Sequence, residues 1–323
     1  MSQPDSRSRM VITDHNFAGE DFERAAAEQL GADFQVYDVA TEADAEAAVR
    51  DADIALVNFA PMTATVLEAM NPGAVVIRYG IGYDNVDLDA ATRLGIRVCN
   101  IPDYGADTVA DHTVTCVLTL LRKIQHFDRA IRRGEWPSAP ELAPIRSMAE
   151  TTVGLLGTGR IGQAVARRLA PFGFEVIAYD PYAKPDDLAD SPITLVELDE
   201  LFRRSHVLSL HAPATPETTG IINAQNLAAM PAGAVLVNTS RGALVDQDAL
   251  LDALDSGHLA GAALDVFQPE PLPVDHPLRS QPNTVLTPHA AFYSEKSIRD
   301  LQRLAAEEAA RAGRGEPLRC QIN

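Results

Sequence analysis

The stretch Thr152-Val153-Gly154-Leu155-Leu156-Gly157-Thr158-Gly159-Arg160-Ile161-Gly162 decides the fold of this chain. Its first five residues form an apolar run typical of a buried strand, and a helical pattern follows to about Leu169. Glycines stand at 157, 159 and 162, where a tight turn, a close approach of backbone to a phosphate and close helix-strand packing each exclude a Cβ. Strand, loop and helix together predict a site for a dinucleotide pyrophosphate.

A second strand is predicted from Glu175 to Tyr179, and it ends at Asp180. An acid at this place accepts hydrogen bonds from the adenosine ribose. A carboxylate there also repels a 2′-phosphate, and Pro181 and Tyr182 supply no cation to bind one. The sequence therefore favours NAD over NADP as the cofactor.

The residues before this motif alternate short apolar runs with alanine-rich, acidic stretches. The pattern predicts strands over 10–12, 34–39, 54–59, 75–79 and 97–99 and helices over 21–30 and 42–50. Such alternation predicts parallel strands with crossover helices, and so a first α/β unit. From Ala106 one long helix is predicted, ending at Gly134, whose apolar stripe either packs within the chain or lines a subunit interface. The proline-containing segment 138–149 is interpreted as an arm or linker.

Composition bounds the class of protein. The chain has 323 residues, 46% of them hydrophobic, which is enough for two domains. Its net charge of −18 argues against electrostatic binding of nucleic acid or anionic membrane, and reflects either a salt-rich habitat or compositional drift. The three cysteines form no metal or redox pattern, so we expect reduced thiols and no metal site. Residues 1–9 are polar and no run reaches the ~18 apolar residues of a membrane span, so a cytosolic protein is expected.

A histidine follows the apolar run 284–286, in the segment Thr287-Pro288-His289-Ala290-Ala291-Phe292. At a strand exit an imidazole projects into the crevice where α/β proteins hold ligands, and it can act there as acid or base. The alternative is a histidine at a helix N-terminus with a structural hydrogen bond. His211 also ends a predicted strand, and we assign it to the cofactor side rather than to acid catalysis.

Two further residues fit the chemistry of a 2-oxo acid, whose reduction needs a hydride donor, a clamp for an anion and a proton. Arg241 could bind the carboxylate and polarise the carbonyl, because a guanidinium is always charged and forms paired hydrogen bonds. Glu270, bonded to the ring nitrogen of His289 that faces away from the substrate, would orient the imidazole and favour its charged form. Taken alone, Arg241 and Glu270 would more often be members of surface ion pairs.

The order of several motifs resembles that of the D-isomer-specific 2-hydroxyacid dehydrogenases, in which about 150 residues precede the glycine motif. The resemblance runs from about residue 10 to 312. Its motifs are Arg78-Tyr79-Gly80-Ile81-Gly82-Tyr83-Asp84-Asn85-Val86-Asp87, Leu208-Ser209-Leu210-His211-Ala212-Pro213 with Thr215-Pro216-Glu217-Thr218, Val237-Asn238-Thr239-Ser240-Arg241-Gly242, and Leu264-Asp265-Val266-Phe267 with Pro269-Glu270-Pro271. Residues 78–85 and 290–294 resemble most the branch with the C-terminal binding protein corepressors and phosphoglycerate dehydrogenase-like members, with Phe292 where the corepressors usually have tryptophan.

The resemblance implies an α/β architecture of two doubly wound parallel-sheet domains, one flavodoxin-like and one Rossmann, with the active site in the interdomain cleft. Residues 1–105 plus 296–323 would form the substrate domain and residues 106–295 the NAD-binding domain. Hinge closure would bring the substrate to the nicotinamide. A homodimer built around the helix from Ala106 to Arg133 is also implied.

The resemblance also assigns residues to the site. Arg241, Glu270 and His289 would carry catalysis, and Asp265 would hold the nicotinamide carboxamide. Cofactor contacts are expected from Gly157, Gly159, Arg160, Ile161, Gly162, Asp180, His211, Ala212, Pro213, Thr218, Thr239, Ser240, Arg241, Asp265 and His289. Substrate contacts are expected from Arg78, Tyr79, Gly80, Ile81 and Phe292.

The sequence thus predicts an NAD-dependent D-2-hydroxyacid dehydrogenase, or 2-oxoacid reductase, with a small 2-oxo or 2-hydroxy acid as its partner. The alternatives are an NADH-sensing regulatory protein like the corepressors, a D-3-phosphoglycerate dehydrogenase, and a dehydrogenase of another anion such as formate or phosphite. Phe292, Tyr79 and the arm near Pro144 to Met148 are the candidates for choosing the substrate. A phosphate would need cations beyond Arg241, for which Arg78 and Arg146 are candidates, so an unphosphorylated acid is preferred.

Overall fold

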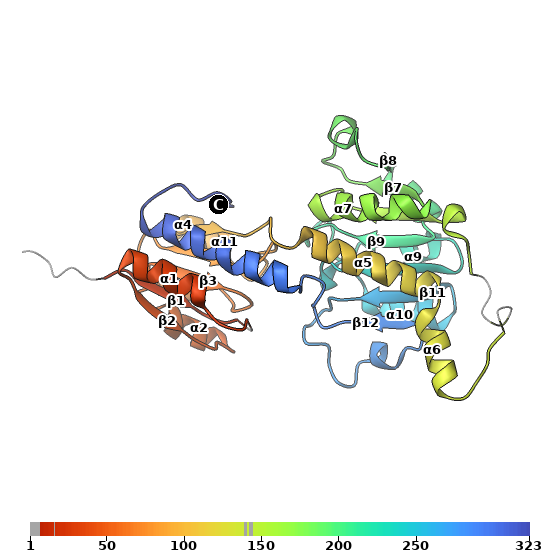
Figure 1. Ribbon diagram of the computed structural model, residues 1–323, viewed down its shortest axis with the longest axis horizontal. Coiled ribbons are helices and arrows are strands. Elements are labelled where there is room, and N and C mark those ends of the chain that lie inside the picture. Colours follow the sequence, from red (N-terminus) through yellow and green to blue (C-terminus); the bar gives the residue numbers. More distant parts are fainter. Residues whose placement is uncertain (1–6, 16, 139–140, 142–144) are drawn as a thin grey trace, which may run out of the picture. The chain divides into compact units, whose positions relative to one another are not determined.

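The computed structural model describes residues 7–15, 17–138, 141 and 145–323 (Figure 1). The chain divides into two compact units, the first formed by residues 1–105 with 294–323 and the second by residues 106–293. The expected boundary of the second unit was residue 295, two residues later. Pro144, expected in the substrate-selecting arm, lies outside the described residues.

The first unit is a five-stranded parallel sheet in the order β2-β1-β3-β4-β5. This is the flavodoxin-like order, with its switch point between β1 and β3. The strands are β1 (Arg9–Ile12), β2 (Asp33–Val36), β3 (Ile54–Val57), β4 (Val75–Arg78) and β5 (Arg97–Cys99). The helices are α1 (Asp21–Leu30), α2 (Glu42–Val49), α3 (Ala64–Glu68), α4 (Leu88–Leu94) and α11 (Glu295–Gly313).

Two apolar layers cover the faces of this sheet, because its strands are buried on both sides. Helices α2, α3 and α4 pack on one face against side chains such as Val57 and Val76. Helices α1 and α11 pack on the other, against side chains such as Ile77 and Tyr79. Three predicted strands end earlier than expected, at Val36, Val57 and Arg78, because the chain turns into the loops at the sheet edge.

The second unit is a seven-stranded parallel sheet in the order β12-β11-β10-β9-β6-β7-β8. The strands are β6 (Thr152–Leu156), β7 (Glu175–Tyr179), β8 (Ile193–Leu195), β9 (Val207–Leu210), β10 (Ala234–Asn238), β11 (Leu259–Leu264) and β12 (Thr284–Leu286). The helices are α5 (Ala106–Leu121), α6 (Ile124–Arg132), α7 (Arg160–Leu169), α8 (Leu198–Arg204), α9 (Ala224–Ala229) and α10 (Gln247–Asp255). Strand order reverses between β6 and β9, which is the switch point of a Rossmann sheet. The prediction of two doubly wound α/β sheets is therefore confirmed.

Helices lie on both faces of this sheet (Figure 1). Helices α5 and α7 pack on one face, with Ala110, Val117 and Val165 among the buried side chains. Helices α8, α9 and α10 pack on the other, with Phe202 and Leu250 buried. Within the described residues, no helix combines the length and the apolar character that crossing a bilayer requires.

The prediction of one helix from Ala106 to Arg133 is wrong. The backbone of Lys123 adopts a left-handed conformation, with φ of 51°, so α5 ends at Leu121 and α6 starts at Ile124. A left-handed residue cannot continue a right-handed helix, and the axis changes direction there.

Candidate active site

The glycine loop lies at the switch point of the second unit, directly after β6. A Cβ at Gly162 would collide with the carbonyl oxygen of Gly157, and a Cβ at Gly157 would lie 2.8 Å from the carbonyl oxygen of His211. Both glycines are therefore required by packing alone. A Cβ at Gly159 would meet nothing within 4 Å, so this position is open toward a ligand. The loop fits a pyrophosphate, whose oxygens can approach the backbone at Gly159 and the start of α7.

Asp180 faces the same loop from the end of β7. One carboxylate oxygen accepts hydrogen bonds from the backbone N–H and the hydroxyl of Thr158, at 2.8 and 2.9 Å, and the other accepts one from the N–H of Tyr182 at 3.0 Å. Desolvation works to raise the pKa of Asp180, but these hydrogen bonds outweigh it and hold the pKa below the ordinary value. Asp180 is therefore an ionised acceptor beside the glycine loop, as a ribose diol requires.

The ring of His289 is held by Glu270. Nδ1 of His289 lies 2.8 Å from Oε2 of Glu270, and Oε1 of Glu270 accepts the N–H of Phe267 at 2.8 Å. Desolvation of Glu270 works to raise its pKa, but the hydrogen bond and charge of His289, the N–H of Phe267 and the charge of Arg241 together hold it below the ordinary value. An ionised Glu270 only accepts hydrogen bonds, so Nδ1 of His289 carries a proton and Nε2 is the ring atom that can exchange one with a substrate.

His289 does not stand at a helix N-terminus. The next helix, α11, is capped by Ser294, five residues later, so the helix-terminal alternative for His289 is wrong. His289 instead has a left-handed backbone, with φ of 51°, and its N–H donates to the carbonyl oxygen of Asp265 at 2.7 Å. A non-glycine residue in this conformation costs about 1 kcal/mol or more, and the bonds around it must offset that cost.

Asp265 supplies those bonds from the end of β11. Its side chain is buried, and its oxygens accept the hydroxyl of Thr287 at 2.5 Å and the N–H groups of Ala290 and Ala291 at 2.8 and 2.9 Å. A carboxylate accepts about four hydrogen bonds. These three leave one acceptor position for the nicotinamide carboxamide that we expected Asp265 to hold.

The remaining residues expected on this unit come from loops at the same edge of the sheet. After β9, Ala212 accepts the hydroxyl of Ser240 at 2.5 Å, and the hydroxyl of Thr218 donates to the carbonyl oxygen of Pro213 at 2.6 Å. Desolvation lowers the pKa of His211 to about 4, so its ring is neutral, as a structural histidine requires. Arg160 and Ile161 start α7, Thr239 and Arg241 follow β10, and the ring of Phe292 lies edge-on to His289, with centroids 6.4 Å apart.

Two contacts of this edge were not anticipated. His112 and Thr113 are neighbours on α5, and no role was predicted for either of them. Nε2 of His112 lies 3.2 Å from the hydroxyl of Thr287, and the hydroxyl of Thr113 lies 2.8 Å from that of Thr239. The sequence signal for these contacts was the pair His112-Thr113, two residues that can form hydrogen bonds in a helix whose predicted stripe is apolar.

The substrate loop expected in the first unit is placed differently. Arg78, Gly80 and Ile81 lie at the carboxyl end of β4, but Tyr79 points into the core and is 1% exposed. Its hydroxyl donates to Glu23 at 2.7 Å, and its N–H donates to Val57 at 2.8 Å. The expectation that the Tyr79 side chain contacts the substrate or chooses it is wrong.

Phe59 is an aromatic residue that the sequence interpretation included in a strand. It follows β3 and is 49% exposed, and the Arg78 guanidinium lies 5.9 Å from its ring centroid. The carboxylate of Asp14, after β1, accepts the N–H groups of Asn58, Phe59 and Ala60, at 3.1, 2.6 and 3.1 Å. Phe59 therefore stands on a fixed loop at the switch point of its own sheet.

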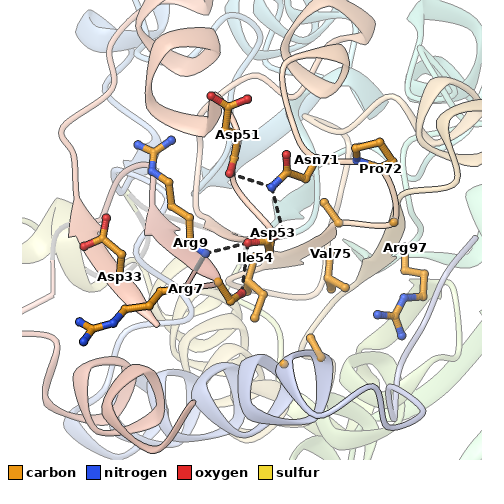
Figure 2. Close-up of a pocket in the computed structure, with 15 residues that line it drawn as sticks. Arg7, Arg9, Asp33, Asp51, Asp53, Ile54, Asn71, Pro72, Val75 and Arg97 are labelled. Carbon is orange, nitrogen blue, oxygen red and sulfur yellow. Dashed lines mark hydrogen bonds between the residues drawn. The ribbon is translucent and has the colours of Figure 1, made fainter. Parts of the chain in front are cut away.

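A pocket of about 600 Å³ lies at the opposite, amino edge of the first sheet (Figure 2). It is lined by the first residues of four strands, Arg9, Ile54, Val75 and Arg97. Asp53 in this pocket accepts hydrogen bonds from the N–H of Arg9 at 2.7 Å, from Asn71 at 2.9 Å and from Ser8 at 3.2 Å. Open α/β sheets bind ligands at their carboxyl edges, so we assign this internal network to the stability of the edge.

The Rossmann order, the glycine loop and the carboxyl-edge residues of the second unit define an NAD-binding oxidoreductase. Comparison with known proteins makes this specific. The family model "D-isomer specific 2-hydroxyacid dehydrogenase, NAD binding domain" matches residues 114–291, and the chain belongs to that family. It is an NAD-dependent enzyme acting on the CH–OH group of hydroxy acids.

Three similar proteins illustrate the relationship. A glyoxylate reductase of Korarchaeum cryptofilum is 40% identical over 83% of this chain and 82% of its own length. A D-3-phosphoglycerate dehydrogenase of Mycobacterium tuberculosis is 43% identical over 75% of this chain, but the match spans only 46% of that enzyme. The D-lactate dehydrogenase of Aquifex aeolicus, solved with NAD and lactic acid, has a TM-score of 0.84 and 29% identity over 95% of this chain and 96% of its own.

Proposed function

We propose that this protein reduces small, unphosphorylated 2-oxo acids with NADH, and that His289 is the proton donor. The observation that carries the proposal is the 2.8 Å bond between Nδ1 of His289 and the ionised Glu270. This bond leaves Nε2 to deliver a proton to the carbonyl oxygen. When bound, the nicotinamide supplies the hydride.

Arg241 is the proposed clamp for the substrate carboxylate. It follows β10 on the edge that also carries Glu270 and His289, and its charge contributes to the low pKa of Glu270. A guanidinium can bind a carboxylate through two parallel hydrogen bonds and polarise the neighbouring carbonyl. Phe292, whose ring lies beside His289, is the proposed residue for selecting the substrate side chain.

A phosphorylated substrate is less well supported. In the first unit the guanidinium of Arg78 already donates to the carbonyl oxygen of Tyr79 at 2.5 Å and lies over the ring of Phe59. The glyoxylate reductase, 40% identical, matches 83% of this chain and 82% of its own length. We therefore prefer substrates such as glyoxylate or hydroxypyruvate over phosphohydroxypyruvate. The backbone of Gly80 and Ile81, in the loop after β4, is the proposed contact for a substrate carboxylate in that unit.

The proposal includes a cytosolic homodimer. The three cysteines are free thiols, as expected in a reducing compartment. Helix α6 exposes two isoleucines, Ile124 and Ile131, 54% and 49% accessible. Apolar side chains gathered on one exposed helix are typical of a subunit interface.

The test is His289→Gln, assayed by NADH oxidation over a panel of 2-oxo acids with and without phosphate. Turnover should fall by about 10²–10⁴, the usual contribution of a general acid, while NADH binding stays unchanged. His258→Gln, at the amino edge of the second sheet directly before β11, is the control. Near-normal turnover by His289→Gln would remove His289 as the acid. Failure of the wild type on every oxo acid, with NADH-dependent binding to a protein partner, would favour the regulatory alternative.

A further inference from the structure

Helix α5 contacts both loops of the proposed site through adjacent residues. His112 reaches Thr287 in the loop of His289, and Thr113 reaches Thr239 in the loop of Arg241. Thr113 is fully buried, and its hydroxyl also bonds the carbonyl oxygen of Val109 at 2.8 Å. The contact of His112 has a further consequence, because it fixes where the ring carries a proton.

The hydroxyl of Thr287 has one hydrogen, and that hydrogen is committed. It is donated to the carboxylate of Asp265, over a distance of 2.5 Å. Thr287 can therefore only accept from His112, so the Nε2 atom of His112 must be the donor. The structure thus assigns the Nε2–H form to His112, which imidazole alone would not specify.

Asp265 is the link from this pair to His289. The carboxylate holds the N–H groups of Ala290 and Ala291, while its main-chain carbonyl oxygen accepts the N–H of His289. The charge of Asp265 also reaches α5, because desolvation and then this charge raise the pKa of the Cys116 thiol to about 12. His112 stands one turn before Cys116, so the helix presents its imidazole N–H to a site with negative charge.

We propose that His112 is a positioning residue, which acts through Thr287 and Asp265 to hold the left-handed loop of His289. This inference rests on the proposed function, since it concerns the loop of the proposed acid. We assign His112 a positioning role and not a catalytic one, because its ring contacts the hydroxyl of Thr287. Its N–H orients the Thr287 hydroxyl toward Asp265, and Asp265 then holds the loop.

The kinetic test compares His112→Gln, whose amide can place an N–H near the position of Nε2, with His112→Leu, which has no donor. The leucine variant should lose about tenfold in kcat, because a misplacement of about 1 Å costs about 10²-fold and the loop of His289 should shift by less than that. KM for the oxo acid should change less than about twofold. The glutamine variant should regain most of the loss. His258→Gln, at the amino edge of the second sheet directly before β11, should match the wild type. Equal losses in the glutamine and leucine variants, or no loss in the leucine variant, would overturn the proposal.

A spectroscopic test needs no turnover. Long-range ¹H–¹⁵N spectra at about pH 8, above the ordinary titration range of imidazole, show which nitrogen of His112 carries the proton. A proton on Nε2 supports the proposal, and a proton on Nδ1 alone overturns it. If His289→Gln kept full turnover, the proposed function would fail while the Nε2 proton of His112 could still be observed, so the two failures are distinguishable.

Discussion

At the scale of single residues, His211 should make the stability of the NAD-binding unit depend on pH. Desolvation lowers the pKa of His211 to about 4, whereas an unfolded chain protonates histidine near 6.5. The folded state therefore binds fewer protons between these values, so its stability is complete above pH 6.5 and falls as the pH drops toward 4. The loss should approach about 3 kcal/mol. His211→Gln should flatten this part of the thermal unfolding profile, and parallel profiles of the two proteins would contradict the assignment.

The same scale shows what the sequence could predict about the site. The residues at the ends of strands in the second unit, including the Glu270–His289 pair, were predicted because their motifs follow strands whose carboxyl ends share one edge. Tyr79 was assigned wrongly, because its loop motif was given more weight than the strand period. Val75 and Ile77 of β4 and Tyr79, the residue directly after it, follow the alternating period of a strand, and all three belong to one buried cluster. The alternation was the signal that Tyr79 points inward.

At the scale of elements, the glycines of the loop between β6 and α7 serve two different purposes. Gly162 is required by packing, and Gly159 is required by the proposed ligand. Gly159→Ala adds a Cβ that meets no protein atom within 4 Å, so we expect an unchanged Tm. The same Cβ would crowd a pyrophosphate, and Kd for NADH should rise at least about tenfold. Gly162→Ala places its Cβ against the carbonyl oxygen of Gly157. This variant should therefore both bind NADH more weakly and have a lower Tm. Calorimetry and NADH fluorescence titration test both, and unaltered NADH binding by Gly159→Ala would contradict the assigned role.

The break between α5 and α6 is a feature of the fold that could not be predicted from the sequence. Helix 21–30 was predicted closely because its pattern stops at Gly31, whose left-handed backbone ends the helix. Helix 160–169 was predicted closely because the glycine motif marks its start. The left-handed residue between α5 and α6 is Lys123, neither glycine nor asparagine, and no proline follows it. Nothing local in the sequence announces such a break.

At the scale of the whole molecule, α6 should control association. Ile131→Glu puts a charge on the proposed interface and should convert the dimer to a monomer in solution scattering at micromolar concentration. Val274→Glu is the matched control, because Val274 is an equally apolar residue in the same unit and is 89% exposed. It should leave the dimer intact. A monomeric wild type, or a dimeric Ile131→Glu variant, would refute the role of α6.

The chain has one tryptophan, and its place decides what optical signals can report. Trp136 follows α6 and is 89% exposed in the single chain. An indole this exposed should emit in the single chain as a hydrated one, so denaturant should change the emission wavelength of a monomer little, and its unfolding is better followed by circular dichroism. Burial against a second subunit would instead shift the emission to shorter wavelength. The emission wavelength of Trp136 should therefore report self-association, and it should report the unfolding of a single chain poorly.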